Sequence, residues 1–96
     1  MASLAIRDRR RIIISGQVQG VAFRLWLTSV AHSLELSGEV QHWEDGRCEV
    51  VVQGERSLVK QFIVACKRGP SGATVQSIEV TEEKVDPACI GFHVQR

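Results

Sequence analysis

The fold is decided by residues 12–36, which read IIISGQVQGVAFRLWLTSVAHSLEL. Ile12 to Ile14 are β-branched and are followed by Ser15-Gly16, a pattern typical of a short buried strand. From there the apolar residues change to the spacing of one helical face: Phe23, Trp26, Leu27, Val30, Ala31 and Leu34. We therefore predict a strand, a glycine-bounded loop and a helix that ends near residues 36–38.

A hairpin is predicted next along the chain. Residues 40–43 and 48–53 are rich in side chains that favour strands, and Asp45-Gly46 lies between them. Asp-Gly favours the positive φ that the central positions of a tight hairpin turn require. The two runs are therefore expected to pair as antiparallel strands.

A second helix and two more strands complete the chain. Residues 57–68 predict the helix, with Ser57 as its N-cap and Gly69-Pro70 as its stop. Residues 75–82 alternate apolar and polar side chains, and residues 92–94 form a last short strand. The order β-α-β-β-α-β-β predicts an α+β ferredoxin-like sandwich, with two helices on one face of a mainly antiparallel sheet.

Length and composition limit the class of protein. The 96 residues suffice for one domain, and 44% apolar with 24% charged residues match an ordinary globular chain. A formal net charge of +1 argues against nucleic acid or a charged membrane surface as a partner. The arginines at positions 7, 9, 10 and 11 favour a solvated, partly disordered tail over residues 1–9, which leaves 10–96 as the domain.

The cysteines and histidines show no metal-binding spacing. Cys48, Cys66 and Cys89 are odd in number and far apart, and the three histidines form no ligand pair. We expect no metal and no cofactor, and we interpret Cys48 and Cys66 as small buried apolar side chains. The apolar stretches are too short for a membrane span and the N-terminus lacks a secretory core, so we expect a cytoplasmic monomer with reduced thiols.

The loop between the first strand and the first helix is the strongest candidate site. Gly16 and Gly20 bracket it, so several backbone N–H groups can turn toward one point at the positive end of the helix dipole. Arg24 lies in the first helical turn and can close over that point. This arrangement suits one tetrahedral phosphate, whereas a Walker loop is absent. The alternative is an ordinary tight turn with a surface arginine.

Residues 16–24, GQVQGVAFR, resemble the G-x-V-Q-G-V-x-F-R signature of the acylphosphatase family. The resemblance covers about residues 10–96. Other positions that match the family are Ala31, Leu34, Leu36, Gly38 to His42, Asp45-Gly46, Gln53-Gly54, Gly69-Pro70 and Phe92.

The resemblance implies a cofactor-free hydrolase of acyl phosphates, the mixed anhydrides of a carboxylic acid and phosphoric acid. In the family, loop amides and the signature arginine hold the phosphate, and an asparagine on the second strand orients a water for direct attack on phosphorus. Carried over by position, Arg24 is the phosphate ligand and the cradle is the backbone of Gln17, Val18, Gln19, Gly20, Val21 and Ala22. The expected partner is a small-molecule acyl phosphate or inorganic phosphate.

His42 stands where the family pattern has asparagine. A carboxamide can accept from water and donate to phosphate on one side, whereas neutral imidazole has its donor and acceptor on opposite sides of the ring. Gln41 cannot replace it, because neighbouring strand residues face opposite sides of a sheet. Two interpretations stay open: His42 is an altered water-positioning residue in a weakened or modified enzyme, or it marks a catalytically impaired phosphate-binding module.

Binding of RNA on the sheet is a further alternative. Such binding needs exposed aromatic side chains on central strands, and the sequence has no Tyr and places only Trp43 and Phe92 on strands. We expect Trp43 to be partly buried in the core, the alternative being an exposed contact with a substrate or partner. We expect no nucleic-acid or membrane partner. Asp45 is assigned to turn chemistry rather than to catalysis.

Overall fold

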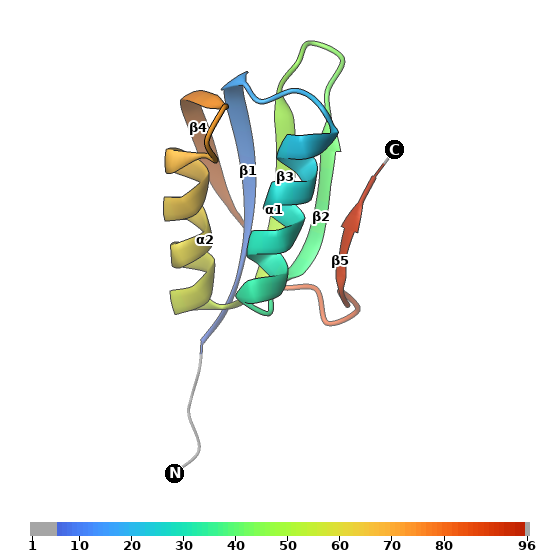
Figure 1. The fold of residues 1–96 in the computed structure, drawn as a ribbon. Coiled ribbons are helices and arrows are strands. Elements are labelled where there is room, and N and C mark those ends of the chain that lie inside the picture. The colour runs from blue at the N-terminus through green and yellow to red at the C-terminus, as the bar shows by residue number, and fades with distance from the viewer. Residues whose placement is uncertain (1–5, 96) are drawn as a thin grey trace.

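A computed structural model describes residues 6–95 and places two helices on one face of a five-stranded sheet (Figure 1). The elements are β1 (Arg7–Gln17), α1 (Val21–Ser33), β2 (Ser37–His42), β3 (Cys48–Glu55), α2 (Arg56–Arg68), β4 (Thr74–Glu83) and β5 (Phe92–Val94). The strand order is β4-β1-β3-β2-β5, with antiparallel pairs throughout except for β5, which lies parallel to β2. The predicted ferredoxin-like α+β sandwich is therefore confirmed. Among the described residues, no helix is long and apolar enough to cross a membrane.

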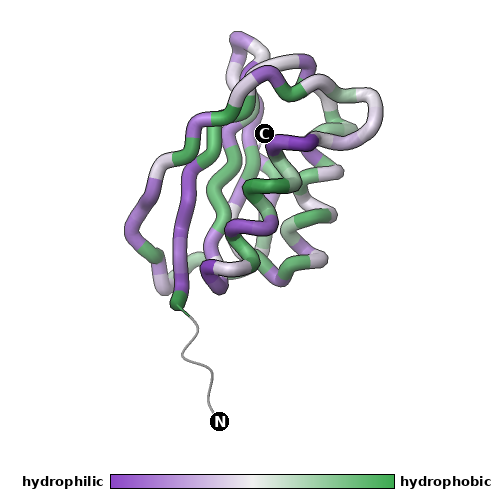
Figure 2. Tube along the Cα trace, turned by 90° about the vertical axis from the view of Figure 1, so that its left-hand side faces the viewer, coloured by the Kyte–Doolittle hydropathy of each residue, from purple (hydrophilic) through white to green (hydrophobic). Residues whose placement is uncertain are grey.

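The core lies between the helices and the sheet. Alternate residues of the central strands point toward the helices, as the period of a strand requires. The helices pack apolar side chains against this face of the sheet, and these are side chains whose spacing predicted the helices. The fully or nearly fully buried side chains are Ile12, Ile14, Val40, Cys48, Val50 and Val52 of the sheet and Phe23, Leu27, Ala31, Val59, Phe62 and Cys66 of the helices. Figure 2 shows these hydrophobic segments recurring along the central strands and both helices.

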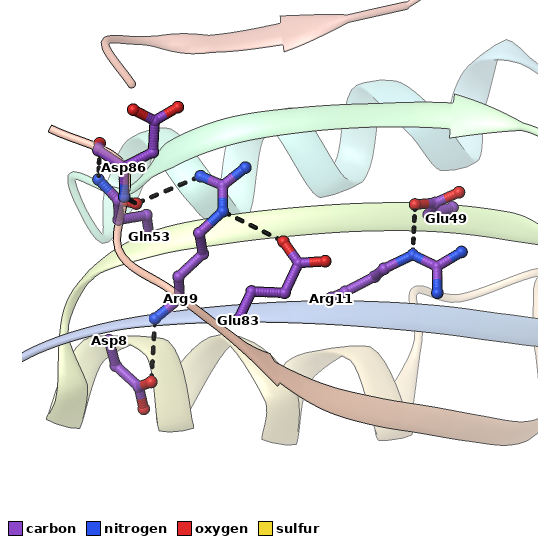
Figure 3. Close-up of polar contacts among 7 residues, drawn as sticks. All are labelled: Asp8, Arg9, Arg11, Glu49, Gln53, Glu83 and Asp86. Carbon is purple, nitrogen blue, oxygen red and sulfur yellow. Dashed lines mark hydrogen bonds and ion pairs between the residues drawn. The ribbon is translucent and has the colours of Figure 1, made fainter. Parts of the chain in front are cut away.

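β1 begins at Arg7, five residues before the strand that the isoleucines predicted, so the interpretation of residues 7–9 as a tail is wrong. Arg9 and Arg11 are held in the sheet by carboxylates on neighbouring strands. Arg9 Nε lies 3.2 Å from Glu83 of β4, and Arg11 Nε lies 2.7 Å from Glu49 of β3 (Figure 3). The part of the predicted tail over residues 1–5 lies outside the described residues.

The chain between β4 and β5 is tied to the sheet through Gln53. This side chain is 2% exposed, and its amide bonds both backbone groups of Asp86 at 2.8 Å (Figure 3). A buried amide is stable only when its polar atoms have partners. Gln53 therefore fixes the segment that brings β5 back to the far edge of the sheet, beside β2.

α1 ends at Ser33, earlier than the predicted residues 36–38. Glu35 adopts a φ of 55°, its N–H donates to the His32 carbonyl at 3.0 Å, and the Leu36 N–H donates to the Ala31 carbonyl at 2.9 Å. These two bonds form a Schellman ending, which satisfies the last carbonyls of the helix and turns the chain into β2. The helix end was predicted too late because Leu36 is apolar and buried although it lies beyond the helix.

The predicted N-cap of α2 is wrong. Glu55 occupies the cap position, no side chain caps the helix, and Ser57 donates instead to the Glu55 carboxylate at 2.7 Å. β3 runs directly into the helix, so no loop residue is left to cap it. The C-terminal prediction is confirmed, because α2 ends at Arg68 and the N–H of Gly69 donates to the Ala65 carbonyl.

Candidate active site

The end of β1, the start of α1 and the end of β2 meet at one edge of the sandwich. A cavity of about 250 Å³ opens there, lined by Gln19, Gly20, Arg24, His42, Trp43, Glu44 and Gly46. The fold therefore brings Arg24 and His42 together with the loop that precedes α1, although the two residues lie 18 positions apart along the chain. Of the predicted cradle, Gln19 and Gly20 line this cavity directly.

The loop leaves backbone donors without protein acceptors. Gly20 holds the N-cap position of α1 with φ 99° and ψ 167°, no side chain caps the helix, and its first turn has no acidic residue. Within residues 6–95, no backbone acceptor is found for the N–H groups of Val18, Gln19 or Gly20. Uncapped N–H groups and the positive end of the helix dipole together favour an anion.

Two glycines shape the site: Gly20 in the loop and Gly46 in the β2–β3 turn opposite it. A φ of 99° at Gly20 is one that side chains rarely adopt, and the space where a Cβ would lie is empty. At Gly46, in the β2–β3 turn, a Cβ would clash with the side-chain amide of Gln19. The turn therefore packs directly against the Gln19 side chain of the loop, which would have to shift if position 46 carried a Cβ.

Arg24 supplies the positive side chain of the site. It is half-buried, and its Nε is fully buried with no hydrogen-bond partner among residues 6–95. A buried donor without an acceptor costs about 1–3 kcal/mol, more when the group is charged. Guanidinium groups bind phosphate oxygens through parallel N–H donors. The unsatisfied Arg24 Nε beside the uncapped loop is therefore an arrangement that an anion would complete.

His42 is fixed by the loop itself. Its Nε2 lies 2.9 Å from the Val18 carbonyl oxygen. Because a carbonyl oxygen only accepts, Nε2 carries the proton, and in the neutral ring Nδ1 is then an acceptor. While this bond is made, His42 can accept a hydrogen bond from a water at Nδ1. Its one N–H is used by the Val18 carbonyl and is not available to the cavity.

Gln41 faces away from the site, as predicted. Its amide donates to Glu49 at 3.1 Å on the sheet face that the helices leave open. Trp43 lies on that same open face rather than in the core, so the expectation for this residue is wrong. Its Nε1 donates to Glu49 at 2.9 Å, and the Arg47 guanidinium lies 4.3 Å from its ring centroid.

Cys48 lies beside His42 in the sheet but is chemically inert. It pairs with His42 across β2 and β3 and has no exposed surface. Burial raises the pKa of the Cys48 thiol to about 12, although the nearby Arg24 charge opposes the shift. A thiol with this pKa stays protonated at neutral pH, so it is not a nucleophile.

The turn between β2 and β3 contributes residues that sequence reasoning missed. Glu44 lines the cavity, and nothing but its place beside Asp45-Gly46 hinted at that. Asp45 has the structural role that was predicted: it accepts from the Arg47 N–H at 3.0 Å, and hydrogen bonds from Arg47 hold the pKa of Asp45 below its ordinary value.

Comparisons with known proteins point to one family. The acylphosphatase family profile matches residues 10–94. A relative named acylphosphatase from Roseiflexus sp. strain RS-1 is 42% identical over 86 residues, which cover 90% of this chain and 92% of that protein. Another acylphosphatase, from Anaeromyxobacter dehalogenans strain 2CP-C, is 45% identical over 88% of this chain and 89% of its own length.

Solved structures agree with the sequence comparisons. The crystal structure of acylphosphatase from Bacillus subtilis superposes with a TM-score of 0.87 at 32% identity, covering 93% of this chain and 99% of that one. Profile, relatives and fold agree on the same residues, and the signature loop lies where β1 passes into α1. This chain belongs to the acylphosphatase family.

Proposed function

We propose that this chain hydrolyses acyl phosphates by direct attack of water on phosphorus, with the phosphate held by the loop before α1 and by Arg24. Family membership supports the reaction, which splits the anhydride into a carboxylate and phosphate. The assignment of individual residues rests on the geometry described above.

The phosphate occupies the point on which the loop and Arg24 converge. The cradle is the backbone of Gln17 to Ala22, of which the N–H groups of Val18, Gln19 and Gly20 are unpaired in the described chain. Arg24 neutralises charge on the phosphoryl oxygens. Because these donors are already in place, they stabilise charge that develops in the transition state without reorganisation.

The attacking water is placed by His42. Neutral His42 accepts one water proton at Nδ1, since Nε2 is engaged by the Val18 carbonyl. The water oxygen forms a bond to phosphorus, the bond from phosphorus to the acyl oxygen breaks, and its electron pair leaves on the carboxylate. One proton of the water stays on the phosphate and His42 returns the other to it, so the acyl phosphate dianion and water give a carboxylate and dihydrogen phosphate. A good leaving group makes positioning and charge stabilisation sufficient.

One observation carries this proposal: Arg24, whose buried Nε has no partner within residues 6–95, lines a cavity together with the uncapped loop and His42. A surface arginine with a structural role would pair with a carboxylate, as Arg9 and Arg11 do. Arg24 is instead left for a ligand.

The test is turnover of acetyl phosphate by the wild type, Arg24→Ala and Arg68→Ala. Arg68 is an exposed arginine in the last turn of α2, so Arg68→Ala is a matched loss of one charge. We expect Arg24→Ala to lower kcat/KM by about 10²–10³-fold, the size of one lost transition-state donor. Unchanged turnover in Arg24→Ala would contradict the assigned site. Phosphate binding by a wild type that turns over no acyl phosphate would instead indicate a binding module.

We also propose that the chain acts as a cytoplasmic monomer on small molecules rather than on nucleic acid or a membrane. Its balanced charge of +1 and the free thiols of Cys48, Cys66 and Cys89 support this proposal. Analytical ultracentrifugation checks it, since a concentration-dependent dimer would contradict the monomer.

A further inference from the structure

A second, larger cavity adjoins the phosphate site. It has a volume of about 630 Å³ and is lined by Val21, Arg24, Leu25 and Val94. Arg24 is common to both cavities, so the two hollows meet at its side chain. The volume lies in the usual range for sites that bind small molecules.

Three aliphatic side chains around this cavity are left uncovered. Val21, Leu25 and Val94 are 60%, 57% and 40% exposed. Val21 and Leu25 lie one turn apart on α1, and Val94 approaches from β5, which lies beside α1 (Figure 1). A single exposed aliphatic residue needs no explanation, but three from two elements around one hollow do.

We propose that this cavity binds the acyl group of the substrate and that it selects an uncharged aliphatic or aromatic acyl group. The inference rests on the proposed function, because the phosphate anchored at Arg24 fixes where the rest of the substrate can go. An acyl phosphate carries its acyl group one anhydride oxygen away from phosphorus, so that group must enter a space that adjoins the phosphate. The cavity lined by Leu25 and Val94 adjoins it through Arg24.

The lining decides the chemistry of the acyl group. Among the described residues four line the cavity: three are aliphatic, and the fourth, Arg24, is committed to phosphate. No carboxylate or amide side chain lines the cavity to recognise a polar acyl group among the described residues. If the acyl group carried a free carboxylate, that carboxylate would have to leave water and lie against aliphatic surface, which is unfavourable.

The test compares two substrates that share the same phosphate. The benzoyl group of benzoyl phosphate covers more of the aliphatic lining than the acetyl group of acetyl phosphate can. The variants are Leu25→Ala and, as a matched control, Val64→Ala on α2, because Leu25 and Val64 are both 57% exposed. We expect Leu25→Ala to lower kcat/KM for benzoyl phosphate about fivefold and for acetyl phosphate less than twofold. Val64→Ala should change neither value.

The outcomes separate this inference from the function on which it rests. Equal effects of Leu25→Ala on the two substrates, or no effect on either, would overturn the acyl site while leaving the hydrolase in place. If the wild type turned over neither substrate, the proposed function would fail, and the acyl site would be decided by binding of phenylphosphonate and methylphosphonate, measured by calorimetry. A preference for phenylphosphonate that Leu25→Ala removes supports the acyl site, and the absence of such a preference contradicts it.

Discussion

At the scale of single residues, the proposed mechanism makes His42 the side chain that decides how well the site can work. A carboxamide in its place would present a donor and an acceptor to the cavity, whereas His42 spends its donor on the Val18 carbonyl. The donors proposed to hold phosphate, which are the loop N–H groups and Arg24, do not include this side chain, although His42 is bonded to the loop at the Val18 carbonyl. In the proposed mechanism His42 therefore limits the handling of water rather than the binding of phosphate.

His42→Asn should raise kcat for acetyl phosphate about tenfold, the effect of one well-placed hydrogen bond in the transition state. His93→Asn is the matched control, because His93 Nε2 also lies 2.9 Å from a backbone carbonyl, that of Ile90, and His93 lines neither cavity of the site. Steady-state kinetics check the prediction. Lower turnover in His42→Asn than in the wild type would show that the imidazole is itself the better water-positioning group.

Gly20→Ala should weaken phosphate binding, because a methyl group there enters the cavity and strains the loop. Gly72→Ala is a close control: Gly72 has a φ of +89° against +99° at Gly20, and neither Cβ would meet a neighbour within 4 Å. Both variants should lose about 1–2 kcal/mol of unfolding free energy through the positive φ. Only Gly20→Ala should lose the rise in Tm that phosphate produces in the wild type. An undiminished rise would place phosphate elsewhere.

At the scale of elements, the ending of α1 carries an avoidable strain. Glu35 holds a φ of 55°, a conformation that glycine adopts at less cost. Glu35→Gly should therefore raise the free energy of unfolding by about 0.5–1 kcal/mol, measured by urea denaturation. Ser29→Gly, at an exposed position inside the same helix, should lower it by about 0.5 kcal/mol. A loss of stability in Glu35→Gly would mean that the glutamate side chain contributes more than the strain costs.

Glu49 connects three strands and should make stability depend on pH. It accepts from Arg11 of β1, from Gln41 of β2 and from Trp43 beyond β2. The hydrogen bond from Arg11 is the main cause that lowers the pKa of Glu49 below its ordinary value of 4.5, and it outweighs the effect of burial. A lowered folded-state pKa adds stability above the unfolded-state pKa, and that stability is lost as pH falls through the folded-state pKa.

Glu49→Gln should accordingly cost about 1–2 kcal/mol of unfolding free energy at pH 7, and the difference from the wild type should shrink as pH falls below the ordinary value of 4.5. Glu79→Gln, an exposed change on β4, is the control and should leave the curve unchanged. Urea denaturation over a pH series checks this. A difference that is constant with pH would contradict the ionic role of Glu49.

Local sequence patterns predicted the type and order of every element but not all of their ends. The spacing of apolar residues located both helices, because a helix face is a local property. The start of β1 was missed because Arg7 to Arg11 form a polar run whose carboxylate partners, Glu49 and Glu83, lie on strands far along the chain. In the candidate site, the signature motif was enough to predict that Arg24 lies at the loop. The position of Glu44 could not be predicted, because it depends on how the β2–β3 turn packs against Gln19.

At the scale of the whole molecule, the site is an opening at one edge of an otherwise ordinary sandwich. The helices cover one face of the sheet, and the ends of β1 and β2 bring the loop, Arg24 and His42 to the same edge. A net charge of +1 provides no long-range field for a polyanion. The balanced net charge does not prevent binding of a small dianion. The groups proposed to bind the dianion are local: backbone N–H donors, a helix N-terminus and one arginine.

The most direct test of this account is where heavy oxygen from labelled water appears during hydrolysis of acetyl phosphate. The enzyme is used at a concentration at which Arg24→Ala leaves only the uncatalysed rate. If water attacks phosphorus at the loop and Arg24, the enzyme-dependent product carries the label in inorganic phosphate and none in acetate. Enzyme-dependent label in acetate would show attack on the acyl carbon and would contradict the account.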